Sequence, residues 1–244
     1  ANIWDPVYSN FKTLDRNDTS ISLSYNIIGP IISNENDVVY IGTEGGGITE
    51  LDTKTNKTKL FDKEDEFGLK TEVIKSLLLV NNRELWIQTL HRGLLVVDIQ
   101  KNKLLKNRIS EKLRSLLDEN IVNSFTQEND SIIWLGTYGS GLIRYNFLNE
   151  QIRSFKSDKG TTGAIPNYIW KVFIDSSKRI WIGTHRGLNY FDLNKFQDKE
   201  LSIHEFVYKE GRDSEYEVTT LIEDSEKNIW IGTNGNGFYN FNNS

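Results

Sequence analysis

The sequence returns five times to the same short phrase, in which an aromatic residue is followed by Ile or Leu, then by a third residue, and then by Thr. The third residue is Gly in four copies and Gln88 in the remaining one. The five aromatic residues lie 46, 48, 47 and 49 residues apart and are Tyr40, Trp86, Trp134, Trp181 and Trp230. Self-similarity at a period of roughly 20 to 50 residues is the signature of solenoids and propellers. The chain is therefore predicted to be a repeat protein.

Each copy of the phrase has the same surroundings. An apolar run and a polar turn precede it, and a glycine-containing turn and a second apolar run follow it, as at residues 169–174 and 187–191. Four strands in about 47 residues match one propeller blade. The fold class is thus predicted to be all-β, a β-propeller of four-stranded antiparallel blades in five repeats.

Two details of the phrase predict how blades pack. The aromatic residues occupy equivalent positions in the middle of a strand, so we expect all five in the core between blades. The glycine after each anchor leaves room for a bulky neighbour, and the glycine of the following turn supplies the positive φ of a tight hairpin.

The two ends of the chain leave the ring size open. Residues 7–14 resemble the fourth strand of a blade, and the last blade stops after its third strand. Residues 1–244 are therefore predicted to form a single propeller domain or a propeller fragment, with 20 strands. Either five blades close into a ring, with the first strand completing the last blade, or they belong to a seven-bladed propeller. One helix is expected at residues 110–120, where leucines recur at helical spacing.

Composition excludes several functions. The formal net charge is −5 and the pI about 5.4, which argues against nucleic-acid or anionic-membrane partners. Cysteine is absent, so disulfides, thiolate nucleophiles and Cys-ligated zinc are excluded. The longest aliphatic run is far shorter than the roughly 20 residues that cross a bilayer. Methionine is also absent, which leads us to expect a segment of a longer protein.

The turns between the second and third strands of the blades differ in sequence from one repeat to the next, whereas the strands on either side of them are similar. In a propeller these turns and the connections between blades emerge on one face, around the central channel. Planar donors and aromatic rings of this kind suit sugar hydroxyls or carboxylates. The candidate ligand-binding residues are His91, Arg92, Tyr138, His185, Arg186, Asn234 and Asn236, with Tyr168 and Trp170 at the start of the fourth blade.

Each of these assignments has a plainer alternative. The turn residues can be solvated side chains that keep the protein soluble, and Trp170 can cap a blade interface. His91 and His185 occupy corresponding turns, but a metal site needs further ligands, and no metal or cofactor is expected. No catalytic residues are assigned, because the sequence contains no phosphate loop, Ser/His/Asp signature or glycosidase carboxylate pair. His204 is expected in a fourth strand, facing its edge.

The pattern is clearest at residues 224–237, where Asp224 precedes the phrase and Gly237 follows it, and it resembles the two-component regulator propeller repeat. Tyr40 and Gln88 depart from that pattern, and the fourth turn is one residue shorter than the third. The resemblance implies the periplasmic sensor region of a hybrid two-component histidine kinase, of a type common in gut Bacteroidetes that digest polysaccharides. It also implies an oligosaccharide ligand, other domains of the parent kinase as partners, and a homodimer.

Two rival functions stay open at this point. Streptogramin-lyase-like propellers are similar in pattern and would make the chain an enzyme, with a His and a carboxylate at one end of the channel. A purely structural propeller would contact only other domains of its own protein. Our prediction for this segment is a sensor without catalytic activity.

Overall fold

The computed structural model describes residues 22–62, 64–117, 120–156, 165–196, 203–206 and 216–242. The chain divides into two compact units, unit 1 (Ala1–Ile74) and unit 2 (Lys75–Ser244). The described part is almost entirely β-strand and tight turn, which confirms the all-β prediction. The strand predicted at residues 7–14 lies outside the described residues.

Unit 1 contains one four-stranded antiparallel sheet in the order β1-β2-β3-β4. Its strands are β1 (Ile28–Ser33), β2 (Val38–Thr43), β3 (Ile48–Asp52) and β4 (Lys57–Leu60). The first repeated phrase forms β2, and its anchor Tyr40 meets Phe61 edge to face, with ring centroids 5.6 Å apart. This sheet is the first blade.

Unit 2 contains four further sheets, each made of strands consecutive in sequence. The second blade has β5 (Ile74–Val80), β6 (Glu84–Thr89), β7 (Leu94–Asp98) and β8 (Lys103–Leu104), and the third has β9 (Val122–Asn129), β10 (Ile132–Thr137), β11 (Leu142–Asn146) and β12 (Gln151–Phe155). The fourth has β13 (Ile169–Ile174), β14 (Arg179–Thr184), β15 (Gly187–Asp192) and β16 (His204–Phe206), and the last has β17 (Val218–Glu223), β18 (Ile229–Thr233) and β19 (Phe238–Phe241). The last blade has three described strands, as its sequence predicts. His204 is confirmed in β16, where its side chain is exposed.

The helical segments lie in the connections. The α-helix α1 (Glu111–Leu117) confirms the prediction for residues 110–120, and its Leu113 is fully buried. Ser110 caps this helix, because its hydroxyl accepts a hydrogen bond from the Leu113 N–H at 3.3 Å. Two short 3-10 turns, η1 (Lys106–Arg108) and η2 (Leu193–Lys195), follow β8 and β15.

The anchor tryptophans explain why neighbouring blades in unit 2 stack. Trp86, Trp134 and Trp181 are fully buried, and each meets a phenylalanine of the following blade. The ring centroids are 5.6 Å apart for Trp86 and Phe147, 5.6 Å for Trp134 and Phe191, and 5.5 Å for Trp181 and Phe241. Large aromatic rings in such offset or edge contacts dominate core energetics. The inter-blade role predicted for these three residues is confirmed.

Trp230, in the last blade, corrects that prediction. Its side chain is 38% exposed, and its ring contact is with Phe238 of its own sheet, at 5.8 Å. The phrase is the same as in the fourth blade, but Trp230 lacks the buried setting that Phe241 helps to give Trp181. The position of an anchor in the phrase therefore does not by itself determine its burial.

An acidic residue six positions before the anchor binds the indole N–H. The Nε1 atom of Trp134 donates to Glu128 at 2.7 Å, that of Trp181 to Asp175 at 2.8 Å, and that of Trp230 to Asp224 at 2.7 Å. In the second blade the corresponding residue is Val80, and the buried Nε1 of Trp86 has no hydrogen-bond partner among the described residues. These acidic residues thus satisfy the indole N–H groups of these three anchors.

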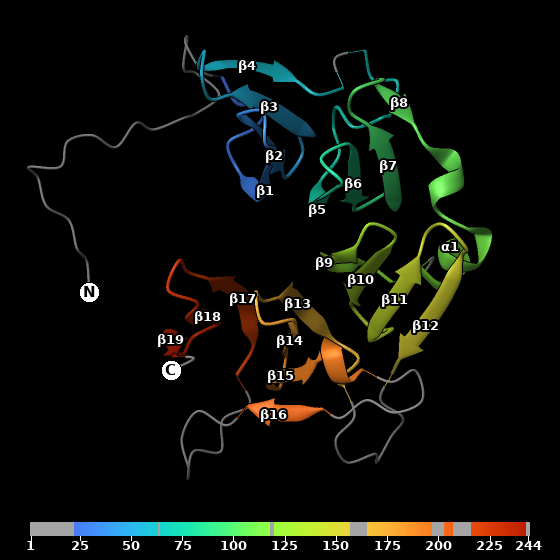
Figure 1. Ribbon diagram of the computed structural model, residues 1–244. Helices are drawn as coiled ribbons and strands as arrows, with labels where there is room; N and C mark the ends of the chain where they lie inside the picture. The colour runs from blue at the N-terminus through green and yellow to red at the C-terminus, as the bar shows by residue number, and fades with distance from the viewer. Residues whose placement is uncertain are drawn as a thin grey trace, which may run out of the picture. The chain divides into compact units, whose positions relative to one another are not determined.

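The glycine two residues after the anchor allows close blade packing. A Cβ atom on Gly136 would lie 2.6 Å from side-chain carbons of Ile169 and Val172, and one on Gly183 would lie 2.7 Å from the Val218 carbonyl oxygen. The first strands β9, β13 and β17 accordingly lie next to one another in unit 2 (Figure 1). This packing brings the turns of neighbouring blades together.

Candidate functional site

The threonine that ends each phrase holds the turn that follows it. The Thr137 hydroxyl donates to the Gly141 carbonyl at 2.8 Å and accepts from the Ser140 N–H at 3.0 Å. The glycine that closes the turn has φ of 71°. The equivalent hydroxyl bonds form from Thr43, Thr89, Thr184 and Thr233. The ends of each turn are therefore fixed while its middle residues are free to differ.

In four of the five blades a backbone hydrogen bond then attaches the turn to the residue just before the first strand of its own blade. The N–H of Tyr138 donates to the Ile121 carbonyl at 2.9 Å, and that of His185 to the Tyr168 carbonyl at 3.4 Å. Between blades, the Gly139 N–H donates to the Asn167 carbonyl at 2.9 Å, and Tyr138 forms an isolated antiparallel bridge with Tyr168. Side chains from the third and fourth blades consequently meet at this edge.

Four of the predicted ligand-binding residues form one aromatic cluster. The ring of Tyr168 lies 4.8 Å from that of Tyr138 and 5.2 Å from the imidazole of His185, both edge to face, and Tyr138 also lies 5.8 Å from Trp170. Tyr138 is 49% exposed and Tyr168 is 42% exposed. Exposed rings held by fixed turns form a surface on which an apolar ligand face can stack.

Trp170 reaches the cluster because β13 is irregular. The pairing with β14 passes from Ile169 directly to Lys171, so Trp170 is the extra residue of a β-bulge. Its side chain is half-buried, and its Nε1 atom has no hydrogen-bond partner among the described residues. Burial lowers the pKa of the neighbouring Lys171 ammonium group. Bulges of this kind commonly re-aim side chains beside functional sites.

The remaining predicted residues do not enter the ring contacts of the cluster. His91 and Arg92 are exposed on the turn between β6 and β7, Arg186 is exposed next to His185, and Asn236 is exposed between β18 and β19. Asn234 lies on that same last turn, and its side-chain amide donates to Glu217 at 2.9 Å. Glu217 was not among the predicted site residues, although it occupies the position before the first strand that Tyr168 has in the previous blade.

Two further features bear on the kind of site. Among the described residues, no group of three or more His, Asp or Glu side chains is placed to hold a metal ion. No helix in the described part of the chain is long and apolar enough to cross a membrane.

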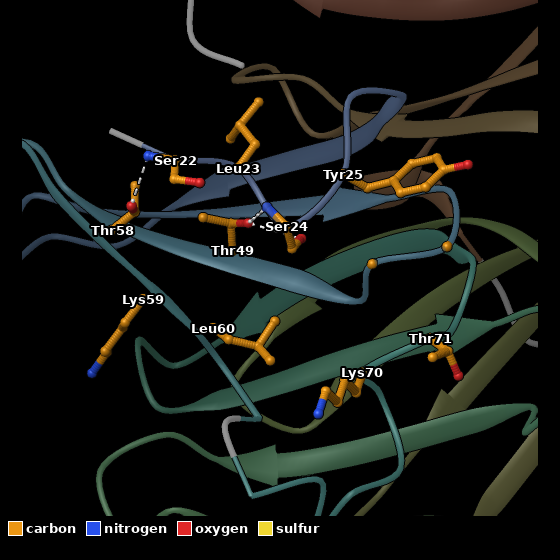
Figure 2. Close-up of a pocket in the computed structure, with 12 residues that line it drawn as sticks. Ser22, Leu23, Ser24, Tyr25, Thr49, Thr58, Lys59, Leu60, Lys70 and Thr71 are labelled. Carbon is orange, nitrogen blue, oxygen red and sulfur yellow. Dashed lines mark hydrogen bonds between the residues drawn. The ribbon is translucent and has the colours of Figure 1, made fainter. Parts of the chain in front are cut away.

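Unit 1 has a separate hollow of about 560 Å³ beside β3 and β4 (Figure 2). Its polar lining is bonded within the protein: the Thr49 hydroxyl accepts from the Ser24 N–H and donates to the Ser24 hydroxyl, both at 3.0 Å. Ser22 likewise donates its N–H to the Thr58 hydroxyl at 3.1 Å. The hollow is lined by Ser22, Leu23, Ser24, Tyr25, Gly45, Gly46, Thr49, Thr58, Lys59, Leu60, Lys70 and Thr71. Because several hydroxyls are already paired, the aromatic cluster is the stronger candidate.

Comparisons with known proteins agree with this architecture. Residues 163–186 and 213–235, which include most of the cluster, match the family model described as two component regulator propeller. The chain is 35% identical over 238 residues to a protein named histidine kinase P4 from Formosa agariphila, covering 97% of this chain and 17% of that protein. The chain therefore spans about a sixth of that relative's length.

Solved structures share the fold at low sequence identity. One, from Bacteroides thetaiotaomicron, is described as the extracellular domain of a one component system, with 20% identity, a TM-score of 0.65, and coverage of 86% of this chain and 25% of that one. A second, the extracellular domain of a hybrid two component system from the same organism, has 18% identity, a TM-score of 0.59, and coverage of 93% and 35%. A β-propeller domain from Myceliophteria thermophila has 12% identity, a TM-score of 0.63, and coverage of 90% and 71%. The chain has a β-propeller fold, and its residues 163–186 and 213–235 match the two-component regulator propeller family.

Proposed function

We propose that this chain is the periplasmic, ligand-sensing propeller segment of a hybrid two-component histidine kinase, and that it binds oligosaccharides without altering them chemically. The histidine kinase from Formosa agariphila supports the parent role, because the match extends along 97% of this chain. The extracellular location printed for the Bacteroides thetaiotaomicron structures supports the location outside the cytoplasm. The proposed partners are the ligand and other domains of the parent kinase.

The observation that carries the ligand proposal is the exposed aromatic cluster. Tyr138 and Tyr168 present two rings 4.8 Å apart, and His185 extends the surface with an imidazole 5.2 Å from Tyr168. The C–H faces of sugar rings stack on such surfaces, while planar polar groups at the edge bond the hydroxyls. Rings from two blades side by side suit a ligand longer than one sugar.

Isothermal titration calorimetry of the purified chain against a panel of plant and host oligosaccharides tests this proposal. We expect saturable binding, and we expect Tyr168→Ala to weaken it by about tenfold, the equivalent of ~1.4 kcal/mol of lost stacking. Phe238→Ala is the matched control, because Phe238 is a strongly exposed ring outside the cluster. Absence of binding across the panel, or equal loss in both variants, would contradict the proposal.

The same samples separate the sensor from a catalyst. Chromatography of the sugars after prolonged incubation should show no new products. Product formation that depends on His185 would assign a lyase activity to this site instead.

Signalling across a membrane commonly uses subunit rotation in a symmetric pair, so the proposal includes a homodimer. Light scattering of the chain with and without its flanking domains measures the mass directly. A monomer under both conditions would remove the dimer from the proposal without affecting ligand binding.

A further inference from the structure

The last blade carries a polar pair where the fourth blade carries two rings. The Asn234 N–H donates to the Glu217 carbonyl at 2.9 Å, just as the His185 N–H donates to the Tyr168 carbonyl at 3.4 Å. The Asn234 amide also donates to Oε2 of Glu217 at 2.9 Å, which fixes the two side chains against each other. Glu217 and Asn234 are thus the counterparts of Tyr168 and His185.

The packing of two glycines indicates how this pair is related to the aromatic cluster. Gly136, two residues before Tyr138, lies against Ile169, the residue after Tyr168. Gly183, two residues before His185, lies in the same way against Val218, the residue after Glu217. The first arrangement places Tyr138 and Tyr168 in ring contact, so by the same packing we expect His185 to lie near Glu217. The resulting order along the edge of the three blades is Tyr138, Tyr168, His185, Glu217 and Asn234, which we call the turn row.

We propose that Glu217 and Asn234 are the specificity-determining end of the turn row, and that they select neutral oligosaccharides over those carrying carboxylates. This inference rests on the proposed sugar-binding function. Within the described part of the chain, Oε1 of Glu217 accepts no hydrogen bond. The side-chain amide oxygen of Asn234 adds a second acceptor. Two acceptors side by side fit the hydroxyl donors of adjacent sugar carbons.

The negative charge of Glu217 is what would distinguish neutral from acidic sugars at this end of the turn row. A uronate carboxylate bound here would lie next to the Glu217 carboxylate, and like charges brought together at an interface are strongly unfavourable. Arg186 is the opposing influence, because it is an exposed cation adjacent to His185 in sequence. The Glu217–Asn234 pair predicts a preference for neutral sugars, and Arg186 predicts a preference for acidic ones. A comparison of ligands that differ only in charge decides between them.

The experiment compares ligands that differ only in that charge. Calorimetry of the purified chain uses two matched pairs: tetragalacturonate with its fully methyl-esterified form, and cellotetraose with its C6-carboxylated form. We expect the neutral member to bind at least about tenfold more tightly, with the difference shrinking as salt is raised. Glu217→Gln keeps an acceptor for Asn234 but removes the charge, and should bring the two affinities of a pair within about threefold.

Glu226→Gln is the control, since Glu226 is an exposed carboxylate of the same blade on the turn between β17 and β18. It should leave the neutral preference unchanged. Equal binding of the two members by the unmodified chain, a preference for the acidic member, or an unchanged preference in Glu217→Gln would overturn the inference while leaving sugar binding intact. If no member of either pair binds and the wider panel also fails, the proposed function falls with it.

Discussion

Trp181 and Trp230 have the same sequence surroundings but differ in how deeply they are buried. Each stands in an Ile-Trp-Ile-Gly-Thr phrase, and each indole N–H donates to an aspartate six residues earlier, at 2.8 and 2.7 Å. Trp181 is fully buried and meets Phe241 of the next blade, whereas Trp230 is 38% exposed and, among the described residues, its ring contact is with Phe238 of its own sheet. The phrase therefore builds a blade, and the neighbouring blade determines how much that anchor stabilises.

Replacing the two anchors should give the largest contrast. Trp181→Ala removes a fully buried ring and should lower the free energy of unfolding by about 3–5 kcal/mol. Trp230→Ala should cost only about 1 kcal/mol, because its ring is already partly in water. Urea denaturation followed by far-UV circular dichroism measures both. Equal losses would show that Trp230 is as well covered in solution as Trp181.

Replacing the glycines of the same two phrases tests the same difference in packing between the fourth and the last blade. A Cβ on Gly183 would lie 2.7 Å from the Val218 backbone oxygen, so Gly183→Ala should destabilise by about 1–3 kcal/mol. On Gly232 the nearest atom is the Thr220 Cγ2 at 2.4 Å, which belongs to an exposed side chain that can rotate away. Gly232→Ala should therefore stay within about 0.5 kcal/mol of the unmodified chain in the same denaturation assay. A larger cost at Gly232 would indicate that this face of the last blade is packed.

The smallest expected effect concerns the indole–aspartate hydrogen bond, which both blades contain. The Trp230 indole N–H, followed by the Asn228 amide, holds the pKa of Asp224 below its usual value. A lowered folded-state pKa contributes stability that is complete above the unfolded pKa of about 4 and is lost as pH falls through the folded value. Asp224→Asn should therefore flatten the decline of the melting temperature between about pH 5 and pH 2. An unchanged acid profile would mean that this bond contributes nothing measurable.

Periodicity alone predicted most of the fold. The repeated phrases form β2, β6, β10, β14 and β18, the glycines after them take positive φ, and the leucines at residues 113–117 form α1. These features follow from local chemistry, which a single repeat contains. The exposure of Trp230 was not predictable in this way, because it depends on contacts that lie outside the phrase.

The site was predicted only in part for a similar reason. Tyr138, Tyr168, Trp170 and His185 were identified as unusual residues on one face, and the structure brings their rings together. Glu217 was missed because a glutamate beside a strand is unremarkable until Asn234 is seen to bind it. Aligning the residues before each first strand would have placed Glu217 in register with Tyr168. The signal was present, but only as a comparison between blades.

The threonine hydrogen bonds that hold the turns have a consequence for how the sequence of such a protein can vary. Because the Thr hydroxyl and the glycine carbonyl tie the two ends of every turn, the residues between them contribute little to holding the sheet together. Mutations there can change the exposed surface of the turns at almost no cost in folding. The sequence of these turns can thus vary widely between related proteins while the blades that carry them keep the same fold.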